Sequence, residues 1–216
     1  MGTYIYWRQM SEIAPEGSPR RKLIDAALYV IRAQGYAAAT VDDICGAAGV
    51  TKGSFFHHFK GKDHLALAAI EHWSAWTGEF FAGAPYQALK DPRQRVFAYV
   101  DFRAALINGD IPRFTCPLGV LMQETYDSHP DLREACRNAI ARHVSTVEAM
   151  LAEAKQRYAP MADWAPADVA AFTQSVLQGG FILAKAEGDA GPAIRALATL
   201  RRFIDLLLPL DIAQNA

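Results

Sequence analysis

Hydrophobic residues recur every three or four positions along most of the chain, and this spacing predicts a protein built from α-helices. In the first such segment the apolar positions are Leu23, Ile24, Ala27, Leu28 and Ile31. No segment alternates between apolar and polar residues over enough positions to predict a β-strand. We therefore expect an all-α fold of about nine helices, without internal repeats.

Capping residues and chain breaks set the expected helix boundaries. Three short helices are predicted near the N-terminus, and the first of them starts at Pro19 and ends at Gly35. The second follows Thr40 and the third follows Thr51, because a threonine hydroxyl can cap the first free N–H groups of a helix. Gly49 permits the tight turn between them. Six longer helices are expected at 63–81, 91–108, 117–127, 131–157, 166–187 and 192–208.

The composition is that of an ordinary globular protein, with 51% hydrophobic and 21% charged residues. No apolar run reaches the ~18 residues of a transmembrane span, and residues 1–17 lack the basic start and apolar core of a secretory signal. Cys45, Cys116 and Cys136 are widely spaced without a CxxC pair, which argues against a disulfide framework or a zinc site. We expect a cytoplasmic protein that does not contact a membrane.

The net charge of −1 conceals an asymmetry along the chain. Residues 18–62 hold seven Lys and Arg against three Asp, a net charge of +4, whereas residues 63–216 hold 14 basic and 18 acidic residues, a net charge of −4. A basic head on an acidic body is typical of a protein whose head alone meets a polyanion.

The segment from Thr40 to Lys62, TVDDICGAAGVTKGSFFHHFKGK, predicts two short helices, a tight turn and an aromatic cluster closed by lysines. In a helix-turn-helix, the second helix places its N-terminal residues against base edges and phosphates. Lys52 would bring charge to a phosphate or a guanine, and Gly53 would let the backbone approach closely. Phe56 and His58 could meet a thymine methyl group or a sugar. The alternative interpretation is a simple helical hairpin whose lysines are solvated.

Residues 19–65 resemble the N-terminal domain of the TetR family of bacterial repressors. The matching elements are Gly35-Tyr36, Thr40-Val41-Asp42-Asp43-Ile44, Ala47-Ala48-Gly49-Val50, Thr51-Lys52-Gly53-Ser54-Phe55-Phe56-His57-His58-Phe59 and Lys60-Gly61-Lys62-Asp63. The resemblance implies an Ω-shaped homodimer that reads a pseudo-palindromic DNA operator and binds a small-molecule effector in its body. The family usually has tyrosine at the position of Phe56. The residues expected to contact DNA are Thr40, Thr51, Lys52, Gly53, Ser54, Phe56, His58 and Lys62.

The expected domain organisation follows from the resemblance and the helix pattern. Residues 1–17 are predicted to be a mobile N-terminal arm, residues 18–64 a helix-turn-helix DNA-binding domain, and residues 65–216 a ligand-binding and dimerisation domain. The last two predicted helices each have an apolar face and are expected to form a four-helix dimer interface with their twofold mates. The alternative is that these faces pack within one monomer. The faces comprise Val169, Phe172, Val176, Gly180 and Leu183, and Ile194, Leu197, Leu200, Ile204 and Leu207.

The body carries a second, weaker resemblance. Thr115-Cys116-Pro117-Leu118-Gly119 and Gln123-Glu124 resemble a C-P-L-G / Q-E signature of a TetR subgroup that includes repressors responding to electrophiles and small unsaturated compounds. Pro117 suits the first turn of a helix, so Cys116 would lie at a helix N-terminus, where the helix dipole favours a thiolate. If Lys185 faces Cys116, a thiol and an amine would meet in an apolar chamber.

The residues expected to contact the effector are Cys116, Phe102, Met122, Tyr126, Gln178, Phe181 and Lys185. The alternatives are a core role for Cys116 and a solvated helix end for Lys185. No catalytic or nucleotide-binding motif is present, so we expect neither an enzyme, a cofactor nor a metal. Glu124 and Asp127 are interpreted as part of a solvated helix face. The predicted function is a repressor released by a small molecule or electrophile; the alternative is a helical ligand-binding or interaction protein whose head does not act on DNA.

Overall fold

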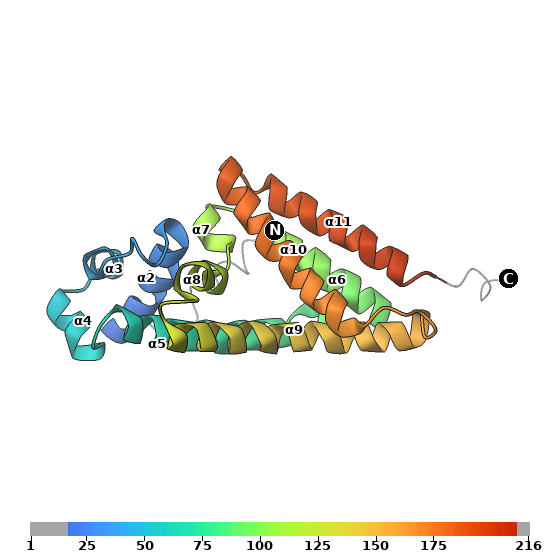
Figure 1. The fold of residues 1–216 in the computed structure, drawn as a ribbon, viewed down its shortest axis with the longest axis horizontal. Helices are drawn as coiled ribbons and strands as arrows, with labels where there is room; N and C mark the ends of the chain where they lie inside the picture. The colour runs from blue at the N-terminus through green and yellow to red at the C-terminus, as the bar shows by residue number, and fades with distance from the viewer. Residues whose placement is uncertain (1–16, 211–216) are drawn as a thin grey trace. The chain divides into compact units, whose positions relative to one another are not determined.

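A computed structural model describes residues 17–210, and within this range all regular secondary structure is helical (Figure 1). The described helices are α2 (Pro19–Gln34), α3 (Val41–Ala48), α4 (Lys52–His58), α5 (Lys62–Ala82), the 3₁₀ helix η1 (Pro85–Ala88), α6 (Pro92–Ala105), α7 (Ile111–Phe114), α8 (Pro117–Thr125), α9 (Pro130–Tyr158), α10 (Pro166–Glu187) and α11 (Gly191–Leu207). The predicted all-α fold is confirmed. The predicted mobile arm, 1–17, lies outside the described residues except for its last position.

Most helix boundaries lie within a few residues of the predicted ones, because capping chemistry sets them. Ser18 caps α2 by accepting a hydrogen bond from the N–H of Arg21, and Pro19 occupies the first helical position. Two elements were not predicted, namely η1 and α7. Each has four residues, which is too short for a helical hydrophobic period to appear.

The chain divides into two compact units. The first unit contains the described residues up to Thr77 together with Pro112–Ala139, and the second contains Gly78–Ile111 and the described residues from Ile140 onward. Helices α5 and α9 each contribute to both units. This division by contacts differs from the functional domains 18–64 and 65–216, which stay a prediction. No helix within residues 17–210 combines the length and apolarity needed to cross a membrane.

The first unit is organised around α2, which packs against α3, α4 and α8. Its core consists of fully buried side chains from α2 through α5, namely Leu23, Ile44, Phe55, Phe59 and Leu65. The predicted apolar face of α2 is buried along its whole length. Long-range packing therefore gives stability to α3 and α4, which are too short to persist as isolated helices.

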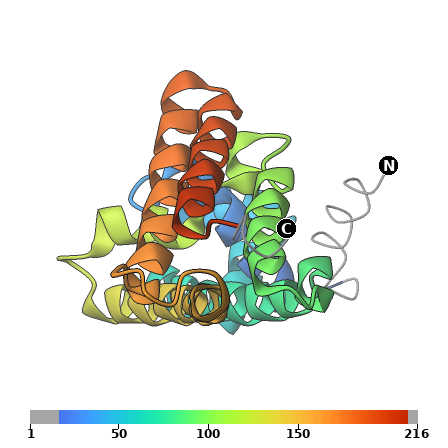
Figure 2. The same ribbon diagram turned by 90° about the vertical axis from the view of Figure 1, so that its right-hand side faces the viewer.

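The second unit is built on three helices that pack side by side. α11 contacts both α10 and α6, and Figures 1 and 2 show α10 in orange next to α11 in red. The core includes Tyr99, Leu151 and Leu197. The predicted apolar faces of α10 and α11 are divided between this core and the surface. Val169, Gly180, Leu197, Leu200 and Ile204 are buried, whereas Phe172, Leu183 and Ile194 are exposed.

Candidate DNA interface and effector region

The helix-turn-helix geometry in the first unit rests on three local features. Thr40 caps α3 through a capping box, in which its hydroxyl accepts from Asp43 N at 3.1 Å and the Asp43 carboxylate accepts from Thr40 N at 3.0 Å. Gly49 ends α3 in the left-handed conformation, with φ of 64°. Thr51 then caps α4 by accepting from Ser54 N at 3.2 Å. The two predicted threonine caps and the glycine turn are therefore confirmed.

Helix α4 divides its residues between an anchor and an exposed face. Phe55, at 0% exposure, is buried in the core, and Phe59, which follows the helix end, is 1% exposed. Phe56 points away from the core and is 59% exposed. Of the residues expected to contact DNA, Thr40, Thr51, Lys52, Gly53 and Phe56 are exposed, and Ser54, His58 and Lys62 are partly buried.

Lys52 is held by an ion pair with α3. Its Nζ lies 2.8 Å from Oδ1 of Asp42, and both side chains are largely exposed. The hydrogen bond with Asp42 raises the pKa of Lys52, so the ammonium keeps its charge. A phosphate that approaches Lys52 therefore also meets the carboxylate of Asp42, which reduces the net positive charge of this surface.

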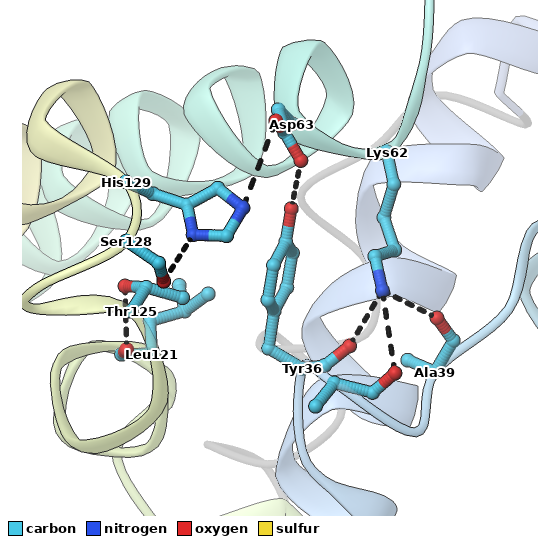
Figure 3. Close-up of polar contacts among 9 residues, drawn as sticks. Tyr36, Ala39, Lys62, Asp63, Leu121, Thr125, Ser128 and His129 are labelled. Atoms are coloured by element: carbon cyan, nitrogen blue, oxygen red, sulfur yellow. Dashed lines mark hydrogen bonds and ion pairs between the residues drawn. The ribbon is translucent and has the colours of Figure 1, made fainter.

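Lys62 has a second role that the sequence did not indicate. Its Nζ donates to the carbonyl oxygens of Tyr36 at 2.8 Å and Ala39 at 3.0 Å, and it lies 4.3 Å from the centroid of the Tyr36 ring (Figure 3). These contacts order the turn between α2 and α3. A DNA contact of Lys62 stays a prediction, whereas its role in this turn follows from the structure.

Tyr36 connects this turn to α5 and to the segment between α8 and α9. Its hydroxyl donates to the carboxylate of Asp63, and its ring contacts the His129 ring edge-on with centroids 5.6 Å apart. Nε2 of His129 lies 3.8 Å from Oδ2 of Asp63, while Nδ1 lies 2.7 Å from the Ser128 hydroxyl (Figure 3). Burial, followed by the hydrogen bond to Asp63, raises the pKa of Tyr36 well above its ordinary value. The phenol is therefore a fixed donor in this cluster.

Glu124 is the clearest difference between the expected and observed roles of a side chain. It is exposed, as a solvated helix face requires, but its Oε2 accepts a hydrogen bond from Ala37 N at 2.7 Å. The interpretation of Glu124 as merely solvated is therefore wrong. The contact joins residues 87 positions apart. In the sequence, Glu124 stood out only as part of the Gln123-Glu124 signature.

Arg32 is a buried cation that the sequence pattern did not single out. Its Nε donates to Leu28 O at 2.7 Å, and its Nη1 lies 3.1 Å from Arg113 O and 3.5 Å from Thr115 O. The guanidinium also lies over the Trp73 ring at 5.2 Å from the centroid. Burial lowers the pKa of Arg32 to about 10, and an opposing interaction with Cys116 raises it. Arg32 thus ties α2 to the segment that precedes α8.

Cys116 is the N-cap of α8 and is partly buried, with Pro117 in the first turn as predicted. Cys136, on α9, is fully buried, and burial raises the pKa of its thiol to about 12. Cys45, on α3, is also buried. Of the three thiols, only that of Cys116 is partly accessible to a reagent.

The residues expected to contact the effector are distributed over both units. Cys116, Met122 and Tyr126 belong to the first, and Phe102, Gln178, Phe181 and Lys185 belong to the second. Phe181 is buried, Lys185 is exposed, and Nε2 of Gln178 is buried without a hydrogen-bond partner in the described part of the chain. A common pocket for these residues stays a prediction.

The second unit also contains a polar group inside an aromatic cluster. Nε2 of His143 lies 2.9 Å from the Tyr99 hydroxyl and 3.3 Å from Nη1 of Arg103, and the His143 ring packs beside Phe81. An arginine can only donate, so Nε2 accepts and the neutral ring carries its proton on Nδ1. Burial, followed by repulsion from Arg103, lowers the pKa of His143 to about 3.

Two family profiles match the chain. Residues 23–69 match the profile described as bacterial regulatory proteins, tetR family. Residues 92–200 match the profile described as tetracyclin repressor-like, C-terminal domain, which by itself spans half of the chain.

Relatives and solved structures extend this similarity over most of the chain. The HTH-type transcriptional regulator LmrA of Bacillus subtilis is 25% identical, over 82% of this chain and 92% of LmrA. The HTH-type transcriptional regulator BetI of Brucella anthropi is 28% identical, over 92% of this chain and 98% of BetI. A crystal structure of the regulatory protein TetR from Rhodobacter sphaeroides is 26% identical, with a TM-score of 0.75 over 84% of this chain and 96% of that protein.

Proposed function

This chain is a member of the TetR family of bacterial regulatory proteins, and we propose that it is a transcriptional repressor that a small-molecule effector releases from its operator. The observation that carries the proposal is the division of α4. Phe55 is locked in the core, while Lys52, Gly53 and Phe56 are exposed on a helix that Thr51 caps. A short, rigidly anchored helix with an exposed polar and aromatic face suits insertion into a major groove.

Operator binding would be tested by a mobility-shift assay on DNA upstream of the gene, titrated with salt. The expected result is binding that weakens steeply as salt rises, because phosphate contacts release counterions. Lys52→Ala should weaken binding, whereas Lys90→Ala, which changes an exposed lysine of the second unit, should not. Absent or salt-independent binding, or equal effects of the two variants, would refute the proposal.

The proposal includes a homodimer with two heads about 34–36 Å apart, or a multiple of that distance, to reach successive major grooves. The exposed apolar side chains of α10 and α11 support it, because a surface of this kind is typical of an interface. Phe172 and Phe203 contact each other across the two helices at 5.2 Å between ring centroids, and Leu206 is 80% exposed. Analytical ultracentrifugation is expected to show a dimer, and a monomer at micromolar concentration would contradict it.

We further propose that Cys116 is the group through which an electrophile acts. Support comes from its partial exposure, which admits a reagent, and from its place at the N-terminus of α8, next to the Thr115 carbonyl that the Arg32 guanidinium binds. N-ethylmaleimide is expected to release the wild-type protein from DNA but not the Cys116→Ser variant. Cys136→Ser is the matched control, because its buried thiol should make no contribution. Normal release of Cys116→Ser would instead indicate reversible binding.

An effector releases DNA only through its differential affinity for two conformations. Shifting a population from almost entirely DNA-competent to almost entirely released requires about 5.5 kcal/mol of that difference. Gln178, whose buried amide nitrogen has no partner within the described residues, supports an acceptor group on the effector. If Gln178→Leu left the effector affinity unchanged in isothermal titration, this contact would be excluded.

A further inference from the structure

The turn between α2 and α3 is shaped to receive a carboxylate from α8. Oε2 of Glu124 accepts from Ala37 N at 2.7 Å. Gly35 has φ of +90°, and a Cβ atom added there would lie 2.5 Å from Oε1 of Glu124. Gly35 therefore serves two purposes, because it ends α2 in a conformation that favours glycine and also leaves space for the Glu124 side chain.

The same turn is also held by Lys62. Its ammonium donates to the carbonyl oxygens of Tyr36 and Ala39 (Figure 3), whereas the Glu124 carboxylate accepts from the Ala37 amide. Thr40, the cap of α3, directly follows Ala39. The position of the turn consequently fixes where α3 begins, and α3 packs against α4.

Helix α8 contacts the α2 region at both of its ends. Ahead of its start, the Arg32 guanidinium binds the carbonyl oxygens of Arg113, in α7, and of Thr115, the residue before Cys116. At the other end, Glu124 binds Ala37. The eight-residue step from Cys116 to Glu124 corresponds to about 12 Å of α-helix, so the two ends are joined by little more than two helical turns. A displacement at Cys116 is thus conveyed to the carboxylate of Glu124.

We propose that Glu124 is a positioning residue for DNA recognition, which holds the α2–α3 turn so that α4 is presented to the operator. The inference rests on the proposed function and deepens it, because it names the contact through which α8 acts on the head. Removal of the carboxylate leaves the turn held by Lys62 alone, without a partner for the Ala37 amide, and a displaced α8 has the same effect.

The test compares Glu124→Ala with Asp127→Ala, which removes an exposed carboxylate just beyond α8. Operator affinity is measured by fluorescence anisotropy, and amide hydrogen exchange at Ala37 is measured by NMR on the free protein. A hydrogen bond to a charged group contributes enough free energy that its loss should lower the operator affinity by about tenfold. We expect about tenfold weaker operator binding and faster exchange at Ala37 for Glu124→Ala, and neither change for Asp127→Ala. Wild-type affinity in Glu124→Ala would overturn the inference.

Two further measurements distinguish positioning from general stability. Gly35→Ala should weaken operator binding by a larger factor in the wild type than in Glu124→Ala, because its Cβ atom meets the carboxylate only in the former. If Gly35→Ala weakened operator binding by the same factor in the wild type and in Glu124→Ala, the two residues would act independently, and a joint role in positioning the turn would be refuted. If the loss of affinity disappears at temperatures where circular dichroism shows Glu124→Ala fully folded, the residue serves stability alone and the positioning role is refuted.

Failure of this inference is distinguishable from failure of the proposed function. A wild-type protein without salt-dependent operator binding would refute the function. In that case, hydrogen exchange at the Ala37 amide still tests whether Glu124 holds the turn, because the measurement needs no DNA. Unchanged exchange in Glu124→Ala overturns the inference whatever the operator assay shows.

Discussion

Acidification should destabilise the second unit through His143. In the folded protein, burial and Arg103 lower the pKa of this imidazole to about 3. In the unfolded chain a histidine has a pKa of about 6.5. Between these two values the unfolded state binds the additional proton, so the free energy of unfolding falls as the pH falls. The contribution of His143 to the free energy of unfolding is complete above the pKa of the unfolded chain. Below that pKa it decreases by about 1.4 kcal/mol for each pH unit.

The magnitude is large enough to measure by urea denaturation. From about pH 7 to about pH 4.5, His143 should account for a loss of about 2.7 kcal/mol. Asp91 stays ionised over this range, because its pKa is lowered: burial opposes the shift, and the hydrogen bond from the Tyr158 hydroxyl with other partners outweighs it. The pKa of His72 is also lowered, by burial and then by Arg21, so part of the total loss belongs to it.

Two variants isolate the contribution of His143. His143→Gln keeps a hydrogen-bonding side chain that does not titrate, and it should remove about 2.7 kcal/mol of the pH-dependent loss. His57→Gln, which changes an exposed histidine of α4, is the matched control and should leave the dependence unchanged. Equal pH dependence in the wild type and in His143→Gln would show that the imidazole is not kept neutral in the folded protein.

Three other predictions concern the DNA interface and the dimer. Asp42→Asn removes the carboxylate that pairs with Lys52, so operator binding should tighten about threefold at low salt; weaker binding would show that Asp42 orients Lys52 for DNA. Lys62→Met should lower the free energy of unfolding by about 1–3 kcal/mol in urea, because the carbonyls of the α2–α3 turn lose their donor, and an unchanged midpoint would contradict that role. Leu206→Glu should convert the dimer to monomers in analytical ultracentrifugation, unlike Ala152→Glu on exposed α9 surface, and a persisting dimer would place the interface elsewhere.

The sequence predicts those parts of the fold that local chemistry determines. Thr40 and Thr51 cap helices because their hydroxyls reach amides three residues away. Gly49 ends α3 because glycine readily adopts the left-handed backbone conformation that this turn requires. The period of apolar residues predicts which face of α2 is buried. The four-residue helices η1 and α7 have no such period, so their existence depends on the surrounding packing.

The candidate site was predicted less completely, for a physical reason. The exposed residues of α4 could be named as candidates because recognition by a helix-turn-helix requires particular residue types at the start of one helix, and their contact with DNA stays a prediction. The contact of Glu124 with Ala37 and those of Arg32 with Arg113 and Thr115 join residues more than 80 positions apart. A single acidic or basic residue gives no periodic signal, so pattern alone cannot distinguish such a tether from a solvated charge.

The division of α4 has a consequence for engineering the protein. Phe55 and Phe59 provide the anchorage of α4, whereas Lys52, Gly53 and Phe56 are exposed and contribute little to the core. The exposed positions can therefore be substituted while the fold and the helix cap are retained. If these positions read the operator as proposed, a library restricted to them would sample new operators within one unchanged scaffold.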